Sequence, residues 1–153
     1  MRFRLDAPTK RGVVLNGVLF RQQREKTADT VMIAITGIHG IFYSNPFYYN
    51  IGDTLNAGGI DFIYAQTNNA FGQIRTVNVN TGKEELIGSW NERFSYTDED
   101  IDAYLTFAEE EGYEHIIAQD IPSAQTMSST TSPAITIRRW STSSCSLPPT
   151  STI

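Results

Sequence analysis

The sequence is poor in the residues that form disulfides and bind metals. Its 153 residues include one Cys, Cys145, and two His, His39 and His115. A single Cys cannot form a disulfide within the chain or complete a multi-Cys zinc site, and two His make a His-based metal site improbable. No G-x-G-x-x-G or Walker sequence is present either, so the phosphate cradle of a nucleotide-binding protein is missing. We therefore expect no metal and no cofactor.

Long apolar runs and an excess of basic charge are also absent. No segment approaches the roughly 18 apolar residues that a membrane span needs, and the start of the chain leads into polar residues rather than a signal-peptide core. The 17 acidic residues outnumber the 12 basic ones, which argues against nucleic acid or a membrane surface as the main partner. These absences predict a cytoplasmic protein, and the chain length predicts one domain.

The composition changes near residue 118. All 11 Gly lie between Gly12 and Gly112, and every Tyr and Phe lies before residue 118. In contrast, 20 of the 36 residues at 118–153 are Ser, Thr or Pro. Such a segment cannot bury enough apolar surface to offset the entropy of ordering the chain. We therefore divide the chain after Ile117 into a partial globular domain at 1–117 and a disordered or irregular tail at 118–153.

Strand patterns in the first part indicate an α/β fold. The β-branched run at 30–36, closed by Gly37, is typical of a central parallel strand that is buried on both faces. Residues 60–65 and the segment that begins at Glu114 have the pattern of further strands. Two apolar triplets flank Asn16-Gly17, which predicts extended chain with either a tight hairpin or a bulge at that point.

Helix patterns alternate with these strands. Residues 46–57 carry apolar side chains on one face after Pro46, which favours a helix start. A second helix is expected from Thr97, a good N-cap, to a point before Gly112. The polar region between them predicts a small hairpin over 75–79 and 85–87. Strands and helices in this order predict a mostly parallel sheet with right-handed crossovers and flanking helices.

Three groups of residues carry side chains or backbone groups that could take part in catalysis or binding. Gly37-Ile38-His39-Gly40 follows a buried strand, where glycines allow backbone N–H groups to face a cleft, although a tight turn explains the motif equally well. Acidic residues at the start of the second helix complement the helix dipole and should stay solvated. His115 is expected to be a packed or edge residue, and Cys145 lacks a neighbouring base. The acidic group comprises Asp98, Glu99, Asp100 and Asp102.

Several blocks together resemble a family of α/β-hydrolases from fungi and bacteria that was long catalogued as being of unknown function and that includes siderophore (fusarinine-type) esterases. The Gly37 to Gly40 motif, followed by Phe42-Tyr43-Ser44-Asn45-Pro46-Phe47-Tyr48, is similar to the family's oxyanion-loop block. Trp90-Asn91-Glu92-Arg93 and the helix at 102–113 fit as well. Ile41 departs from the pattern, since a small or polar residue is expected there. The resemblance covers about three quarters of the chain and implies that Gly37, His39, Gly40 and Ile41 belong to an oxyanion loop.

The same resemblance exposes a missing nucleophile. In such hydrolases the strand beginning at Ile116 should lead into Gly-His-Ser-x-Gly, the sharp turn that presents the catalytic Ser, and this elbow is expected soon after Ile117. Here the chain continues as Ala118-Gln119-Asp120-Ile121-Pro122, and no Gly-x-Ser-x-Gly occurs in it. We therefore expect no catalytic nucleophile after Ile117 in the chain as written.

Codon degeneracy suggests why the turn is missing. When each tail codon's third base is read with the first two bases of the next codon, the segment from Ala118 permits Ala-Gly-His-Ser-Leu-Gly-Ala-Asn. We hypothesise that the tail is an out-of-frame translation. The lost strands would carry the acid and His of the triad, and the edge of the remaining half-sheet would be unpaired and prone to aggregation.

The sequence thus favours a truncated, inactive serine hydrolase whose intact homologue would cleave carboxylic esters, siderophore esters included. A small-molecule ester would be the substrate of the intact homologue. Two alternatives stay open. One is a non-catalytic binding or decoy half-domain with a Ser/Thr-rich tail, and the other is an acyltransferase or lyase on the same fold.

Overall fold

The computed structural model describes residues 1–22, 28–36, 46–70, 72–91, 93, 95–121 and 135–139, and for residues 95, 120, 121 and 135–139 it describes the backbone alone. These residues form a six-stranded sheet, a separate two-stranded hairpin, two α-helices and a short 3-10 helix. The fold is therefore α/β, as the patterning predicts.

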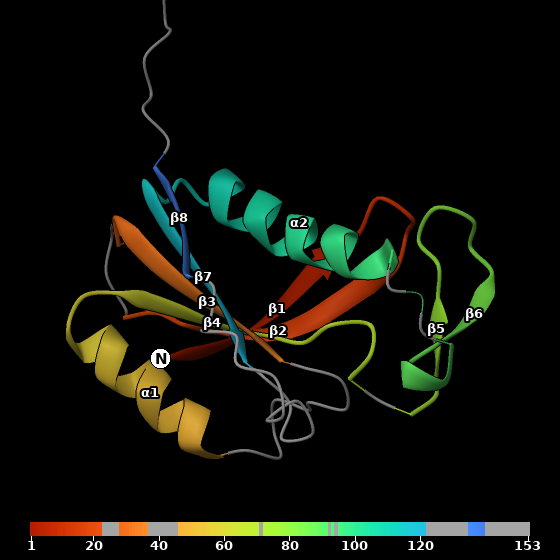
Figure 1. Cartoon of the computed structure of the whole chain (residues 1–153), viewed down its shortest axis with the longest axis horizontal. Coiled ribbons are helices and arrows are strands. Elements are labelled where there is room, and N and C mark those ends of the chain that lie inside the picture. Colours follow the sequence, from red (N-terminus) through yellow and green to blue (C-terminus); the bar gives the residue numbers. More distant parts are fainter. Residues whose placement is uncertain are drawn as a thin grey trace, which may run out of the picture.

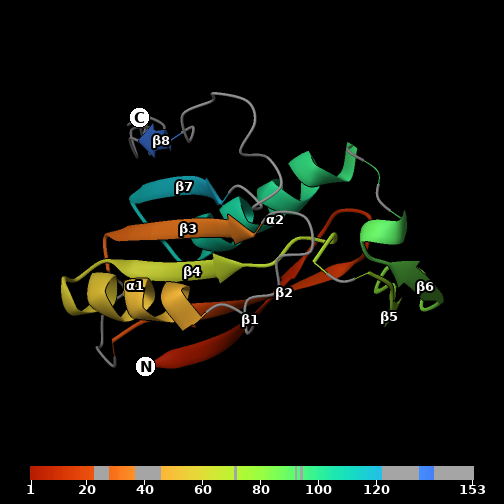
Figure 2. The ribbon, with the colours of Figure 1, turned by 60° about the horizontal axis from the view of Figure 1, so that its bottom comes forward.

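The centre of the large sheet is parallel. It consists of β3 (Thr30–Thr36) between β4 (Asp61–Ala65) and β7 (His115–Ile121). Figure 2 shows β7, β3 and β4 pointing the same way. Every residue of β4 and five of the seven in β3 are buried, because the sheet is covered on both faces. The prediction of a central parallel strand at 30–36 is confirmed.

The strand β7 does not end at Ile117, where the sequence predicts the boundary between the domain and the tail. Ile117 is the third of its seven residues and pairs with Met32 of β3. The parallel register with β3 continues for four more residues, up to Ile121 opposite Thr36, because backbone pairing does not require an apolar sequence. The change of composition after Ile117 therefore does not coincide with the end of β7 at Ile121, and the division into domain and tail stays a prediction.

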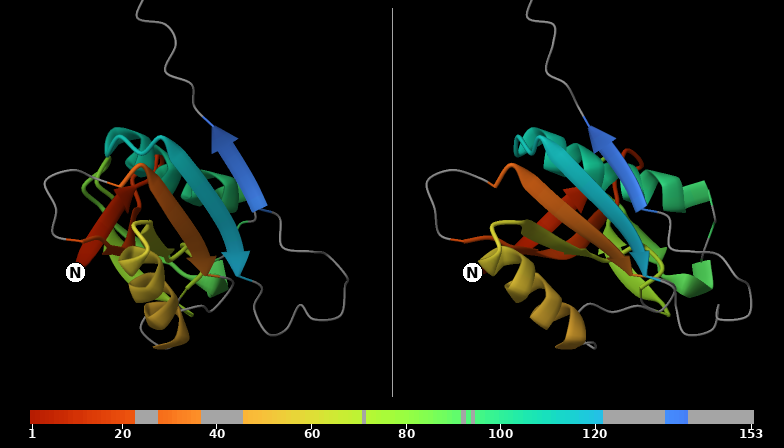
Figure 3. Two further views of the ribbon diagram at one scale, coloured as in Figure 1. Left: turned by 90° about the vertical axis from the view of Figure 1, so that its left-hand side faces the viewer. Right: turned by 60° about the vertical axis from the view of Figure 1, so that its left-hand side comes forward.

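Helices cover both faces of this sheet. α1 (Pro46–Ala57) connects β3 to β4, and α2 (Ser95–Glu110) lies on the connection from β4 back across β3 to β7. The two connections run in opposite directions along the sheet, so crossovers of one handedness place their helices on opposite faces. Figures 1 and 3 show α1 and α2 on opposite sides of the strands.

The N-terminal edge of the sheet is antiparallel. β1 (Arg2–Pro8) pairs with β2 (Val14–Phe20), and β2 pairs with β4, which gives the order β1-β2-β4-β3-β7-β8. Asn16-Gly17 lies inside the continuous strand β2, so the expectation of a hairpin turn or a bulge at that point is wrong. The turn contains Gly12 instead, whose φ of +93° suits a residue without a Cβ.

Between β4 and α2 the chain leaves the main sheet. β5 (Ile74–Val77) and β6 (Glu84–Ile87) form the expected hairpin, and the 3-10 helix η2 (Ser89–Asn91) follows. Figure 1 shows this excursion at one end of the molecule, beside the start of α2.

The second helix begins earlier than its sequence predicts. α2 starts at Ser95, so the expected N-cap Thr97 lies within the first turn. The ring of Tyr96 packs against the guanidinium of Arg11, 4.3 Å from its carbon. This tertiary contact stabilises a turn of helix that the local sequence does not specify.

β8 (Ile135–Arg139) covers the outer edge of β7. The two strands pair antiparallel from His115 opposite Arg139 to Gln119 opposite Ile135. The expectation of an unpaired edge at β7 is therefore wrong. Within the tail at 118–153, the structure describes only the end of β7 and β8, so the tail's predicted irregularity elsewhere lies outside the described residues.

Apolar side chains form one cluster on each face of the sheet. The α2 face carries the larger cluster, and the α1 face carries an aromatic cluster. Aromatic rings meet mostly edge to face in the smaller cluster, an arrangement that favours close packing. The α2 face includes Leu5, Leu15, Val31, Ile33, Ile63, Tyr104 and Ile116, and the α1 face includes Phe20, Phe62 and Tyr64 with Tyr48 and Tyr49 against them.

Gly52 allows α1 to lie close to the sheet, and its replacement by Ala should destabilise the protein. A Cβ at this position would lie 2.7 Å from a ring carbon of Phe62 and 2.8 Å from one of Phe20. Ala is the better helix former by about 1 kcal/mol, but overpacking a core costs about 1–3 kcal/mol. Because both rings are buried, we expect Gly52→Ala to lower the free energy of unfolding by about 1 kcal/mol in urea titrations. Asn50→Ala, on the exposed side of α1, should not lower the free energy of unfolding. An equal increase in the free energy of unfolding for both variants would contradict this prediction.

Candidate functional site

The carboxyl ends of the three parallel strands meet at one edge of the sheet. The register places Thr36 at the end of β3 level with Ile121 at the end of β7, and Ile35 level with Ala65 at the end of β4. The chain leaving β3 and the chain leaving β4 lead to helices on opposite faces. Open α/β sheets bind their ligands at such a switch point. This carboxyl edge is therefore the candidate functional site.

The predicted oxyanion loop begins at this edge. Gly37 directly follows β3, and the loop ends where α1 begins at Pro46. The loop residues lie outside the described part of the chain, so their role stays a prediction. The structure adds the location of the two ends that the loop joins. The residues concerned are Gly37, His39, Gly40 and Ile41.

Ile117, the residue after which the missing elbow is expected, lies within the sheet rather than at its carboxyl edge. It is flanked by Met32 of β3 on one side and by Ile137 of β8 on the other. A sharp strand-to-helix turn directly after Ile117 would interrupt both pairings. Asp120 and Ile121, which stand where the elbow is expected, are the last two residues of β7 and lie at the carboxyl edge.

Buried polar side chains gather where β3 and β4 end. Thr36, Gln66 and Asn68 are each more than nine-tenths buried, and their Oγ1, Oε1 and Oδ1 atoms have no hydrogen-bond partner among the residues that the structure describes. A buried polar atom without a partner costs about 1–3 kcal/mol. Such groups call for a partner that completes their bonding, such as an ordered water or a ligand. Nothing in the one-dimensional pattern distinguishes these residues from ordinary loop residues.

Tyr104 of α2 fixes the position of the chain at the end of β4. Its hydroxyl lies 2.8 Å from the carbonyl oxygens of Asn16 and Gln66, to which it can donate, and it accepts the Gln66 N–H at 3.1 Å. Burial raises the pKa of Tyr104, so the hydroxyl keeps the proton that it donates. The helical spacing identifies Tyr104 as a core residue, but the role of its hydroxyl depends on the tertiary structure.

Asp100 holds the same chain from the start of α2. Its Oδ2 accepts the backbone N–H of Asn68 at 2.8 Å, and its Oδ1 accepts a hydrogen bond from Nη2 of Arg11 at 2.6 Å. Burial raises the pKa of Asp100, although the bonds from Asn68 and Arg11 act in the opposite direction. The carboxylate thus links the β1–β2 turn, the end of β4 and α2.

The expectation that the whole acidic group is solvated is wrong for Asp100. Only 1% of this residue is exposed, because Arg11 and the backbone of Asn68 enclose it. Glu99 is also partly buried and forms a second ion pair with Arg11 at 3.1 Å. The helix-dipole interpretation holds for exposed Asp98 in the first turn.

His115 lies at the opposite edge of the sheet. It is the first residue of β7, is partly buried, and donates its backbone N–H to the carbonyl oxygen of Asp29. The prediction of a packed or edge residue is confirmed. At about 3.3 Å per residue, the length of β7 separates His115 from the carboxyl edge by about 20 Å. The other sequence candidate, Cys145, lies outside the described residues.

The described part of the chain contains neither a cluster of metal-binding side chains nor a helix suited to crossing a membrane. No group of three or more His, Cys, Asp or Glu side chains there could hold a metal ion. Neither of its α-helices combines the length and apolar character that a membrane crossing requires.

Two esterases of known structure share this arrangement of strands and helices. Est1E from Butyrivibrio proteoclasticus matches 76% of this chain with a TM-score of 0.54 and 15% identity. The Pyrococcus furiosus esterase PF2001 matches 78% with a TM-score of 0.55 and 14% identity. The chain has a partial α/β-hydrolase fold. It spans 40% of the length of either esterase. No family model matches the sequence, and neither does any curated protein.

In the α/β-hydrolase fold, two of the connections at the carboxyl edge carry catalytic groups. In this fold the nucleophile follows a central parallel strand at a sharp strand-to-helix turn, and the oxyanion hole takes an N–H group from the loop between the third strand and the first helix. In this chain the strands that end at this edge include β3, which precedes α1, and its parallel neighbour β7.

Proposed function

We propose that the chain is the N-terminal part of a cytoplasmic serine hydrolase that cleaves carboxylic esters, siderophore esters among them. The observation that carries the proposal is the pairing of β3 with β7, which sets Thr36 beside Ile121. A Ser just after β7 would therefore stand next to the N–H groups of the loop after β3. In the intact enzyme this Ser attacks the ester carbonyl, and backbone N–H groups near His39 to Ile41 stabilise the oxyanion.

The chain as written is inactive in this proposal. Asp120, Ile121 and Pro122 stand where the elbow is expected, and a one-base shift of frame at the same place permits Gly-His-Ser-Leu-Gly. The esterases of the same fold are about twice as long as this chain, since 76% and 78% of the chain match 40% of either one. Both facts support a frameshift that removed the nucleophile and the later strands.

Restoring the frame should restore a reactive Ser. We expect a fluorophosphonate to label the frame-restored protein and not the chain as written. A Ser→Ala change in the restored elbow should abolish the labelling, because the serine oxygen is the attacking atom. Sequencing of the gene and transcript across codons 110 to 153 would show which frame is present. A folded, frame-restored protein that escapes labelling would contradict the proposal.

One observation favours a second function, a non-catalytic binding domain. β8 pairs with the edge of β7, so this edge is covered without the further strands of an intact hydrolase. This alternative predicts a monomer that unfolds cooperatively and is found in cells at 17.1 kDa, the mass of the chain as written. Aggregation of the purified chain would count against it.

A further inference from the structure

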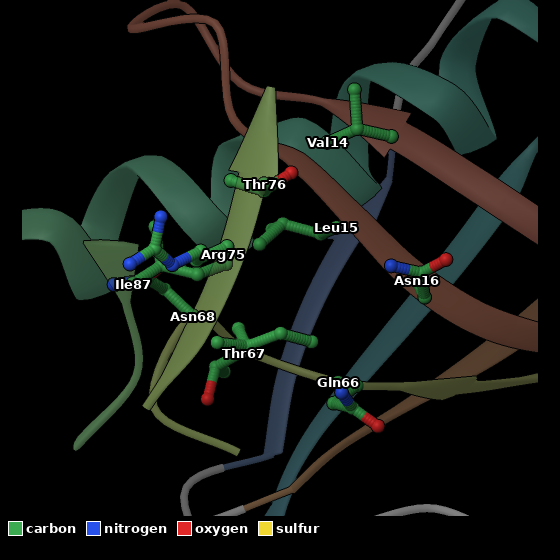
Figure 4. Close-up of a pocket in the computed structure, with 10 residues that line it drawn as sticks. Val14, Leu15, Asn16, Gln66, Thr67, Asn68, Arg75, Thr76 and Ile87 are labelled. Carbon is green, nitrogen blue, oxygen red and sulfur yellow. The ribbon is translucent and has the colours of Figure 1, made fainter. Parts of the chain in front are cut away.

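A small cavity lies between the main sheet and the β5–β6 hairpin, beside the chain that leaves β4. Its volume is about 70 Å³. Figure 4 shows Leu15 pointing from β2 toward the hairpin strand that carries Thr76, with Thr67 nearby. Asn68 and Ile87 also line it. The cavity therefore adjoins the carboxyl edge at which the proposed reaction takes place.

We propose that this cavity is a subsite for a small hydroxyl- or amide N–H-bearing group, and that Asn68 is the residue that holds this group. The proposal rests on the proposed function only in identifying the bound group as a branch of the ester substrate. The binding itself needs neither the elbow Ser nor the restored frame.

The first argument is an unused hydrogen-bond acceptor. Asn68 is 4% exposed, it lines the cavity, and its Oδ1 has no partner among the described protein groups. The backbone N–H of the same residue is donated to Asp100. Asn68 is therefore held in place by a contact that does not use its side-chain oxygen. A preorganised acceptor of this kind loses little entropy when a ligand arrives.

The second argument concerns charge. A carbonyl oxygen only accepts, so the occupant must donate a hydrogen bond. Among the described residues no carboxylate lines the cavity. Arg75 does line it, but three quarters of its side chain is exposed and it pairs with Glu84. A cation inside would have no carboxylate of the described residues beside it, which disfavours an ammonium group or a metal ion. A neutral hydroxyl or N–H group meets no such penalty.

The third argument concerns size. A volume of about 70 Å³ is well below the roughly 300–1,000 Å³ of a typical ligand pocket. The cavity therefore accommodates the tip of a substrate branch rather than a whole ester. Leu15 and Ile87 supply apolar wall, which suits the carbon that carries the donor group.

Ethylene glycol is a suitable test ligand because it is small, neutral and carries two donors. We expect saturable shifts of the amide signals of Thr67, Asn68 and Thr76 when isotope-labelled full-length chain is titrated and followed by NMR. Acetonitrile, which accepts but does not donate, should not produce them. Asn68→Leu removes the acceptor at similar volume and should weaken glycol binding about two- to tenfold, the usual value of one hydrogen bond.

Two further variants separate binding from folding. Ile87→Phe should fill the cavity from the hairpin and abolish glycol binding while the acceptor of Asn68 is intact. Asn50→Leu, a matched change on the exposed side of α1, should leave binding unchanged. Equal shifts with acetonitrile, no saturation with glycol, or unchanged binding in the folded Asn68→Leu variant would overturn the subsite.

The subsite and the proposed function fail in different ways. Glycol binding together with an unlabelled, folded, frame-restored protein would support the subsite and refute the serine hydrolase. Labelling of the restored Ser without glycol binding would support the hydrolase and overturn the subsite.

Discussion

Asp61→Ala is expected to lower the free energy of unfolding by about 4 kcal/mol, because it leaves three donors in or beside the core without their acceptor. Asp61 is fully buried at the start of β4. Its Oδ2 accepts the hydroxyl of Tyr113 at 2.9 Å and Nε of Arg21 at 3.3 Å, and its Oδ1 accepts Nδ2 of Asn56 at 3.1 Å. These contacts hold the chain at the ends of β2, α1 and α2 against the start of β4. Urea denaturation monitored by circular dichroism measures the change.

Asp53→Ala is the matched control for this prediction. Asp53 pairs with Arg2, but about half of each side chain is exposed. Exposed ion pairs contribute about 1 kcal/mol or less, so this variant should unfold at nearly the urea concentration of the original chain. Similar losses for both variants would mean that burial does not govern the energy of these pairs.

Asp100→Ala should cost about 3 kcal/mol, the second largest effect that we expect. The change leaves the backbone N–H of Asn68 without its acceptor and removes one of the two carboxylates that pair with Arg11. Loss of one partner from a buried pair costs about 3–5 kcal/mol, and the remaining pair with Glu99 places this case at the lower end. The stability loss can be measured by the same urea titration.

Hydrogen exchange adds a local test of Asp100. The amide of Asn68 should lose its protection in Asp100→Ala, because the carboxylate is its acceptor. Asp98→Ala, two residues earlier in α2, should change stability by less than about 1 kcal/mol, since Asp98 is exposed and acts through the helix dipole. An Asn68 amide that remains protected in the Asp100 variant would contradict the role given to this carboxylate.

The strands and helices that the sequence predicts correctly are those with strong local patterns. The apolar run at 30–36 is β3, and the residues after Pro46 form α1 up to Ala57, as expected. The hairpin of β5 and β6 also follows from turn-forming residues between short strands. In each case a continuous apolar run, a hydrophobic period, or a Gly or Pro residue in or next to the segment carries the information.

The errors occur where a residue's environment comes from distant segments. Asn16-Gly17 has the sequence of a turn, but pairing with β4 makes it the interior of a strand. Asp100 has the sequence of a solvated helix start, but Arg11, 89 residues away, encloses it. The composition changes after Ile117, yet β7 continues to Ile121 beside β3 and pairs with β8. None of these environments is encoded in the residues next to the one in question.

The sequence by itself determined the α/β class, the central strand, the first helix, and the absence of Gly-x-Ser-x-Gly after β7, because each of these is a property of neighbouring residues. Only the tertiary structure decided that the ends of β3 and β7 are adjacent, that Asp100 holds Asn68, and that a cavity lies under the hairpin. These features arise from strand register and burial, which depend on contacts between residues far apart in the chain.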